Sequence, residues 1–472
     1  MELLSPAGSS EKLQYAYLYG ADAAYIGLKK FSLRVKADNF YESEYERVRE
    51  IMAQFPGRKL YCALNISFHN RDIDAFIADI GYFKQYPIDA FIVQDMGVVP
   101  ILQKHFPEAA LHLSTQANCI NREAVKVYRG MGFSRIVLGR EASLAEIRQI
   151  KDAVPDMELE AFAHGAMCIA YSGRCLMSTY LNGRSANGGL CSHSCRWEYR
   201  LKADAAAVQA LAESGALALE EYKRSGEYLP VFEGDGFTAV LSSKDLCMID
   251  HLADMQAAGV DSLKIEGRMK SVYYTALITR AYRKALDALA GNISQKDAEP
   301  FIAELYNVSH RAFGTGFYYG QNDANETVSG ASESDYELAA EIGAELAPAE
   351  AAQLFASAAE TQAARERELA QMHAAAREAA LRSKPHPVYA APREGWKLFW
   401  FTALNKICAG TAVECVAPDI VSLEIAGDAY VLIEPHTGTL LDWVCHGHDC
   451  VLMTAAPAAP GQLVRVRSAA RE

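Results

Sequence analysis

The sequence predicts an α/β protein built on a (β/α)8 TIM-like barrel, with a long cysteine-bearing insertion after the seventh strand. Three observations support this prediction. Short β-branched and apolar runs alternate with amphipathic helical segments up to about residue 295. Four of the 11 cysteines fall within one glycine-rich stretch. Beyond residue 330 the composition changes, which indicates a helical insert and a small all-β module.

Eight strands are expected in the barrel, at residues 2–8, 23–28, 59–65, 90–95, 111–118, 135–140, 157–165 and 262–268. The segments between them, such as EKLQYAYLYG and LAEIRQIKDAV, carry apolar residues at helical spacing. Eight strands that alternate with helices are typical of a parallel barrel. A doubly wound open sheet is the alternative, but no G-x-G-x-x-G follows the first strand to support it.

These patterns divide the chain into four parts. Residues 1–295 form the barrel, which includes the insertion at 165–260 and closes with the helix VYYTALITRAYRKALDALAG. A connector is expected at 296–335, followed by an Ala/Glu-rich segment at 336–390 that predicts one or two exposed helices over 336–383. Short alternating strands then predict the β module at 391–472.

Polar side chains cluster at the predicted C-terminal strand ends, the face that carries the active site in such barrels. They are Asn65, Gln94, Asp95, Gln116, Asn118, Arg140, His164, Lys264, Glu266 and Arg268. Some of them, Asp95 and Asn118 above all, are expected only to cap the next helix.

Composition bounds the class of protein. Half of the 472 residues are hydrophobic and 22% are charged, which predicts a sizeable core. No run approaches the roughly 18 apolar residues that cross a bilayer, and the start MELLSPAGSSEKL lacks the pattern of a signal peptide. We therefore expect a cytoplasmic protein without a membrane partner, in which thiols stay reduced.

The net charge of −13 argues weakly against a nucleic-acid partner, but its distribution is uneven. Between residues 168 and 200 the only acidic residue is Glu198, whereas four arginines occur: Arg174, Arg184, Arg196 and Arg200. The cysteine region is therefore locally basic. The alternative is that these arginines simply keep a loop solvated.

The clustered cysteines, Cys168, Cys175, Cys191 and Cys195, are spaced C-x6-C-x15-C-x3-C. Reducing surroundings disfavour a disulfide knot, and only the second pair fits zinc-ribbon spacing. Iron–sulfur ligands vary more widely in spacing. Two other interpretations remain. The cysteines could be four small hydrophobic residues of the core, or one of them could be a catalytic thiol with His164 or His193 as its base. The number of thiols favours a metal site, with an iron–sulfur cluster foremost.

Other metal and hydrolase motifs are weak or missing. The run CHGHDC at 445–450 offers four metal ligands, but side chains packed so tightly would point in conflicting directions, so a turn is expected there. No G-x-S-x-G, H-E-x-x-H or G-x-x-x-x-G-K-[ST] occurs in the sequence. These observations argue against the commonest hydrolase and nucleotide-binding sites.

The run FAHGAMCIAYSGRCLMSTYLNGRSANGGLCSHSCRWEY closely resembles the signature of the collagenase-like U32 peptidase family. ELLSPAG, YGADAAYIGL, FSLRVKADNF, LHLSTQAN and SLKIEGRMKS resemble its other blocks in the same order, so the likeness covers residues 1–320. Several members of this family are iron–sulfur proteins needed for oxygen-independent hydroxylation of tRNA, ribosomal RNA or ubiquinone precursors. FSLRVKADNF, REASLAEI and RWEY are most similar to the branch that hydroxylates tRNA.

This resemblance implies a function and a cofactor. The branch converts the wobble uridine of tRNA to 5-hydroxyuridine, with prephenate implicated as the source of the hydroxyl group. By resemblance, Cys168, Cys175, Cys191 and Cys195 would hold a 4Fe–4S cluster. Hydroxylation of a ubiquinone precursor or ribosomal RNA, and peptidase activity, are the alternatives. The segment at 336–383 departs from the family pattern, and the β module matches it only loosely.

We expect five residues to line the catalytic pocket: Glu160, His164, Lys264, Glu266 and Arg268. The basic members suit a small dicarboxylate co-substrate, although a structural Lys–Glu–Arg network would also explain them. Candidate contacts to tRNA phosphates are Arg34, Lys36, Arg174, Arg184, Arg196 and Arg200. A splayed tRNA base could stack against Tyr171 or Trp197.

Overall fold

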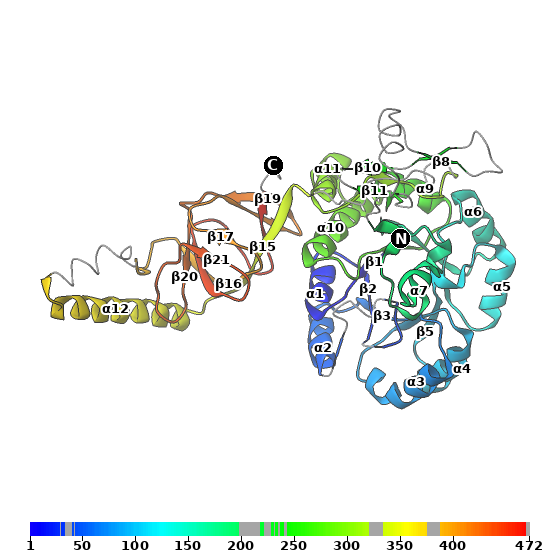
Figure 1. Ribbon diagram of the computed structural model, residues 1–472, viewed down its shortest axis with the longest axis horizontal. Coiled ribbons are helices and arrows are strands. Elements are labelled where there is room, and N and C mark those ends of the chain that lie inside the picture. The colour runs from blue at the N-terminus through cyan, green and yellow to red at the C-terminus, as the bar shows by residue number, and fades with distance from the viewer. Residues whose placement is uncertain are drawn as a thin grey trace, which may run out of the picture. The chain divides into compact units, whose positions relative to one another are not determined.

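The computed structural model describes the chain except at residues 29, 34–39, 42, 198–217, 221–227, 231, 235–236, 240–242, 321–333, 375–387 and 469–472. Backbone alone is described at Arg196 and in strands β8 to β11. The chain folds as two compact units, residues 1–333 and 334–472 (Figure 1).

The first unit contains a closed barrel of eight parallel strands. The strands are β1 (Glu2–Pro6), β2 (Ala23–Ile26), β3 (Lys59–Leu64), β4 (Ala90–Val93), β5 (Ala110–Leu113), β6 (Arg135–Val137), β7 (Glu158–Ala166) and β13 (Ser262–Ile265). They pair in chain order, and β13 pairs with both β1 and β7. The predicted (β/α)8 barrel is confirmed, with each strand where its apolar run predicted it.

Helices surround the barrel, as Figure 1 shows. They are α1 (Ser10–Leu18), α2 (Glu44–Gln54), α3 (Asn70–Phe83), α4 (Val99–His105), α5 (Arg122–Gly130), α6 (Leu144–Ala153), α9 (Leu252–Ala257), α10 (Val272–Leu289) and α11 (Gln295–Ala303). Side chains of Ser9, Ser143 and Ser271 accept N-terminal amide hydrogens of α1, α6 and α10, which fixes where these helices begin.

Two expected strands, the fourth and the fifth, are shorter than their apolar runs. The fifth ends at Leu113 because the Ser114 side chain caps a 3-10 turn, η2 (Thr115–Ala117), and Asn118 follows it with φ 56°. Asp95 likewise caps η1 (Met96–Val98) by accepting from the Gly97 amide, as its position predicted. Polar residues at strand ends therefore divide between helix capping and the barrel mouth.

Strand β7 changes partners along its length. Its register with β13 runs from Glu160 opposite Ser262 to Phe162 opposite Lys264, and then skips to His164 opposite Ile265. The extra residue is a β-bulge at Ala163, which reverses the side to which the following side chain points. Beyond it, β7 pairs antiparallel with β12 (Asp245–Cys247), and β12 pairs with β14 (Phe313–Gly314).

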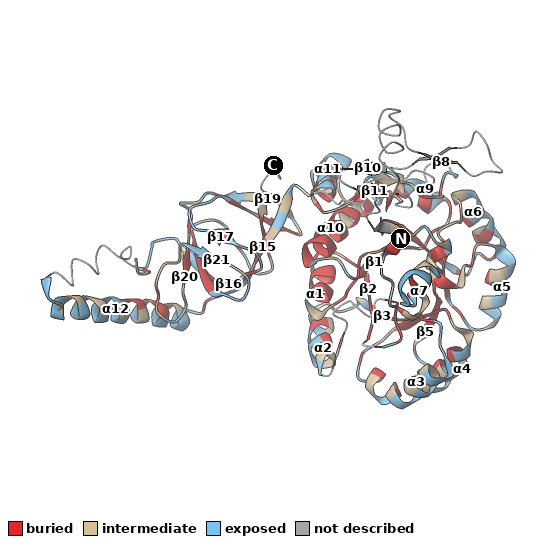
Figure 2. Ribbon diagram, in the orientation of Figure 1, coloured by how far each residue is buried: buried red, intermediate tan, exposed pale blue. Residues whose placement is uncertain are grey.

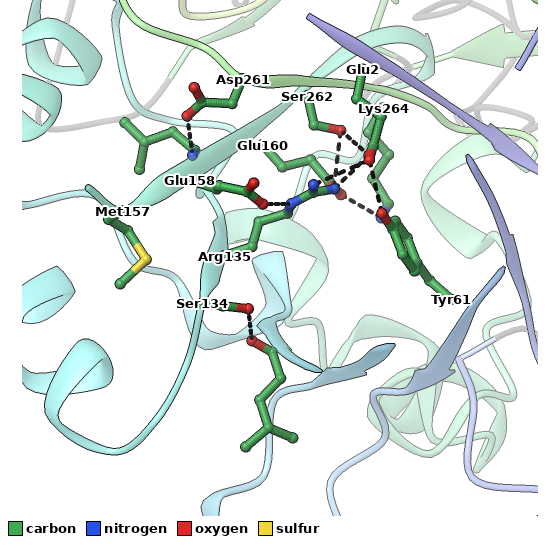
Figure 3. Close-up of polar contacts among 12 residues, drawn as sticks. Glu2, Tyr61, Ser134, Arg135, Met157, Glu158, Glu160, Asp261, Ser262 and Lys264 are labelled. Atoms are coloured by element: carbon green, nitrogen blue, oxygen red, sulfur yellow. Dashed lines mark hydrogen bonds and ion pairs between the residues drawn. The ribbon is translucent and has the colours of Figure 1, made fainter. Parts of the chain in front are cut away.

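A network of charged side chains occupies the barrel interior near the N-terminal ends of its strands (Figure 3). Arg135 donates to Glu2 Oε1 at 2.5 Å, to Glu158 Oε2 at 2.8 Å and to Glu160 Oε2 at 3.1 Å. Lys264 Nζ lies 2.7 Å from Glu160 Oε1. Glu160 is completely buried, so its charge depends on these two cations.

Between β7 and β12 lie the cysteine segment, with helix α7 (Met177–Asn182), and four short strands among the described residues. The strands β8 (Ala218–Glu220) and β9 (Tyr228–Pro230) form one antiparallel pair, and β10 (Phe232–Gly234) and β11 (Phe237–Ala239) form another. Within the described residues no helix is both long and apolar enough to cross a membrane.

The second unit is built on a seven-stranded antiparallel sheet in the order β19-β18-β23-β15-β16-β22-β20. Its strands are β15 (Tyr336–Glu345), β16 (Lys397–Ala403), β18 (Val413–Ala417), β19 (Ile420–Ile425), β20 (Tyr430–Ile433), β22 (Asp449–Thr454) and β23 (Leu463–Arg467). A small pair, β17 (Ile407–Cys408) with β21 (Trp443–Val444), adjoins the core of this unit.

The prediction of helix throughout 336–383 is wrong at its beginning. Residues Tyr336–Glu345 form a central strand of the sheet, paired with both β16 and β23. Helix α12 covers Pro348–Gln371, and residues 375–383 of the predicted segment lie outside the described residues. Burial of Ala339, Ala340 and Ile342 in the sheet core outweighs the helical preference of an Ala/Glu-rich run.

The Glu160 network predicts an acid-sensitive core. Burial opposes ionisation of Glu160, but the charges of Lys264 and Arg135 outweigh it and place the pKa of this carboxyl below its ordinary value. Its stabilisation is therefore complete above the ordinary pKa of about 4.5 and is lost as the pH falls below it.

We expect Glu160→Gln to lower the free energy of unfolding at pH 7 by about 3–5 kcal/mol, because it leaves the buried Lys264 ammonium without its carboxylate partner and removes one of the three carboxylates around Arg135. Urea unfolding measures this change. The matched control is Glu50→Gln in an exposed ion pair with Arg47, where a change within about 0.5 kcal/mol is expected. Equal effects of the two substitutions would contradict the role of the network.

Candidate active site

A cavity of about 160 Å³ lies at the C-terminal ends of the barrel strands. Residues from the strands and the loops after them line it, including Tyr25, Asn65, Gln116, Arg140, Phe162, Lys264, Glu266 and Arg268. All four cysteines of the cluster motif line the same cavity. Thiols and charged groups that are up to 100 residues apart in the sequence, Cys168 and Arg268, thus meet at one site.

The four cysteines are free thiols of intermediate exposure. The Met177 amide donates to Cys175 Sγ at 3.3 Å, and the His193 amide donates to Cys191 Sγ at 3.4 Å. Amide hydrogens directed at sulfur stabilise the thiolate, the form that binds metal. Cys62 and Cys119, elsewhere in the barrel unit, are buried, and burial raises the pKa of Cys62 to about 12 and that of Cys119 to about 11.

The cysteine segment is tied to the barrel loops by residues that sequence reasoning missed. Glu141, after β6, accepts hydrogen bonds from the backbone and the hydroxyl of Ser172, which adopts φ 42°. Asn187 accepts from the Cys175 amide through its side chain at 3.2 Å and from the Ser67 amide through its carbonyl at 3.1 Å. The proximity of Glu141 to the strand end at Arg140 was the available signal for the first of these contacts.

The donor set fits a thiolate-bound cluster in its chemistry. Four free cysteines face one cavity, and two of them receive amide hydrogen bonds. Across the described parts of the chain, no three His, Cys, Asp or Glu side chains converge closely enough to hold a metal ion. The residues are therefore suitable ligands, whereas the bound arrangement is not seen.

Three cations lie on the barrel side of the cavity. Lys264 Nζ sits 4.4 Å from the Tyr25 ring, and the Arg140 guanidinium lies 4.0 Å from the Phe162 ring. Arg268 donates to Ser32 Oγ at 2.8 Å and fills the space beside Gly27, where a Cβ atom would come within 2.3 Å of its Nη1. Glu266 is the carboxylate that lines the cavity with them, so this wall carries net positive charge.

Of the five residues predicted to line the pocket, three line the cavity and two do not. Lys264, Glu266 and Arg268 line the cavity, but Glu160 lies beneath Lys264 in the charge network. His164 is also outside the cavity, which corrects the prediction. The bulge at Ala163 turns it outward, where its ring packs against Tyr282 and Phe313 at 5.6 and 5.3 Å between centroids.

The residues predicted to contact RNA are partly described. Arg174 and Arg184 are exposed on the cysteine segment, and Arg174 donates to Gln94 Oε1 at 3.1 Å. Tyr171 and Trp197 are also exposed. Arg34, Lys36 and Arg200 lie outside the described residues, as does the side chain of Arg196.

The motif CHGHDC forms a turn between β21 and β22, as expected. Cys450 is buried in β22, whereas the Cys445 amide lies 3.4 Å from His448 Nδ1. The His448 ring packs against Trp443. These contacts give the run a structural role in the second unit.

The chain matches Peptidase family U32 over residues 8–328. It is 40% identical over 342 residues to tRNA hydroxylation protein P of Escherichia coli, an alignment that covers 67% of this chain and 74% of that protein. A 23S rRNA 5-hydroxycytidine synthase of Escherichia coli is 38% identical over 289 residues, 61% of this chain and 40% of that protein. A collagenase of Porphyromonas gingivalis is 30% identical over 332 residues, covering 68% and 74%.

His164 provides a test of its outward position. Burial, opposed by Asp245 and assisted by His310 and Lys270, lowers the pKa of His164 to about 3. Between pH 4 and 6 the unfolded chain therefore binds one more proton at this residue than the folded chain. Folding stability should rise with pH by about 1.4 kcal/mol per unit from this group.

We expect His164→Phe to remove that slope, measured by urea unfolding at several pH values between 4 and 6. A histidine that titrates normally in a wet pocket would give the wild type and the variant nearly equal slopes in this range. His69→Phe makes the same substitution at an exposed residue at the start of α3 and serves as the matched control.

Proposed function

The chain belongs to peptidase family U32, as its motifs indicate, and we propose that it hydroxylates the wobble uridine of tRNA to 5-hydroxyuridine without molecular oxygen. The single observation that carries this proposal is the convergence of four free cysteines and three cations on one cavity at the barrel mouth. The 40% identity to a tRNA hydroxylation protein supports tRNA as the substrate.

In this proposal Cys168, Cys175, Cys191 and Cys195 hold a 4Fe–4S cluster. When bound, such a cluster would supply one-electron redox chemistry beside the cavity. The amides of Met177 and His193 would moderate the charge on two of the thiolates. All 11 cysteines are free thiols, which fits the reducing conditions of the cytoplasm.

The cations would bind the co-substrate, for which prephenate is the proposed candidate. A dicarboxylate needs two separated positive charges, and Lys264 and Arg268 provide them on the same wall. Glu160 keeps the Lys264 ammonium at the base of the cavity through their 2.7 Å contact. The Arg268 guanidinium, positioned by Ser32, can meet a carboxylate in two parallel hydrogen bonds.

Hydroxylation of ribosomal RNA is a second candidate, favoured by 38% identity to an rRNA hydroxycytidine synthase. The two reactions share the chemistry of the cavity and differ in the RNA that reaches it. Nucleoside analysis of both RNA fractions, from cells with and without the gene, separates them. Loss of 5-hydroxyuridine and its derivatives from tRNA alone is the expected result, and unchanged tRNA nucleosides would refute the proposal.

Substituting any one of the four cysteines by serine should lower bound iron and sulfide and abolish tRNA hydroxylation. The measurements are iron and sulfide content and visible absorption after purification without oxygen. Cys408→Ser, at an exposed thiol in the second unit, is the matched control and should retain the metal. A colourless wild-type protein that nonetheless hydroxylates tRNA would contradict the cluster.

Arg268→Gln should raise the KM for prephenate by about 10- to 100-fold while leaving the iron content unchanged, because a charged hydrogen-bonding pair is lost. Arg148→Gln, on the exposed surface of α6, is its control. Circular dichroism verifies that both variants fold. An unchanged KM in the folded variant would assign Arg268 a structural role.

A further inference from the structure

We propose that the outer face of the cysteine segment is a stacking surface for unpaired RNA bases, with Tyr180 as its most exposed residue. This inference rests on the proposed function and assigns the RNA contact to particular side chains. The surface consists of Tyr171, Leu176, Tyr180, Leu181, Leu190 and Trp197, all of which are exposed. The Tyr180 side chain is 88% exposed and that of Leu176 is 72% exposed, high values for large apolar residues.

Helix α7 presents this surface above the cavity. Met177 and Ser178 line the cavity, whereas Leu176 and Tyr180, four residues apart and therefore on one side of the helix, point to solvent. Figure 2 shows α7, mostly in the pale blue of exposed residues, over the end of the barrel. A base stacked on Tyr180 would thus lie beside the opening through which its neighbour could enter the cavity.

Hydrogen bonds hold the surface in place before any ligand arrives. The hydroxyls of Ser178 and Ser192 lie 2.9 Å apart, and the Ser192 amide donates to Ser178 Oγ at 3.0 Å. The Trp197 indole N–H donates to the Ser192 carbonyl at 3.1 Å. Ser192 therefore connects α7, Trp197 and the second cysteine pair, and the Trp197 ring needs little ordering when it binds.

The charge of the segment selects the kind of partner. Residues 168–197 contain Arg174, Arg184 and Arg196 but no aspartate or glutamate, although the whole protein carries −13. Arginine beside exposed tyrosine and tryptophan is the combination that binds single-stranded RNA, the cation meeting phosphate and the ring meeting a base. An acidic electron-carrier protein would bind the same arginines. The binding experiment contains RNA and no second protein, so it distinguishes an RNA partner from a protein partner.

The test measures the affinity of the holoprotein, without oxygen and with no other protein present, for a tRNA transcript with an unmodified wobble uridine. Tyr180→Ala should weaken binding by about 5- to 100-fold, the range for loss of one base–aromatic stack. Tyr180→Phe should stay within about twofold of the wild type, because stacking needs the ring and not the hydroxyl. Tyr180→Leu should behave like the alanine variant, which separates stacking from simple apolar burial.

Two further variants complete the design. Arg184→Gln should reduce the slope of log K against log salt by about 0.7, as expected for one lost phosphate contact. Trp443→Ala removes an exposed aromatic side chain in the second unit and should leave the affinity unchanged.

The outcomes distinguish the inference from the proposed function. Wild-type protein that hydroxylates tRNA, together with an alanine variant that binds it equally well, overturns the stacking surface alone. This result is expected if the face binds a protein. Wild-type protein that neither binds nor hydroxylates tRNA overturns both.

Discussion

The buried carboxylate of Glu160 organises the interior of the barrel. A charge without access to water is tolerated only when several partners compensate it, and here Arg135 and Lys264 do so from two neighbouring strands. The same contacts keep an ammonium group on the wall of the cavity. The core of the barrel and its chemically active end are therefore parts of one electrostatic arrangement, and neither can change its charge independently.

A single extra residue in strand β7 changes the direction of the side chains that follow it. Before Ala163, Glu158 and Glu160 serve the charge network, whereas the bulge sends His164 into the layer between strands and helices. The strand then continues beyond the barrel, pairs with β12 and delivers Cys168 to the mouth. Core packing, closure of the sheet and placement of the first thiol all depend on this strand.

Much of this architecture could be predicted from local pattern. The alternation of apolar runs located the eight strands, and the cysteine spacing together with strand-end position placed the thiols, Lys264, Glu266 and Arg268 at one end of the barrel. Side-chain direction after a bulge could not be predicted, because it depends on pairing with β13. The strand at Tyr336–Glu345 was missed for a similar reason, since its partners lie more than 50 residues away in sequence.

The ties between the cysteine segment and the barrel bear on how such a protein can diversify. The segment contacts the loops after β3, β4, β5 and β6 through Ser67, Gln94, Asn118 and Glu141. A change of length in any of these loops would displace the thiols relative to the cations. Barrels usually acquire new substrates by varying their loops. In this protein, four such loops support the cysteine segment, so we expect changes of substrate to arise on surfaces that do not support the cysteines.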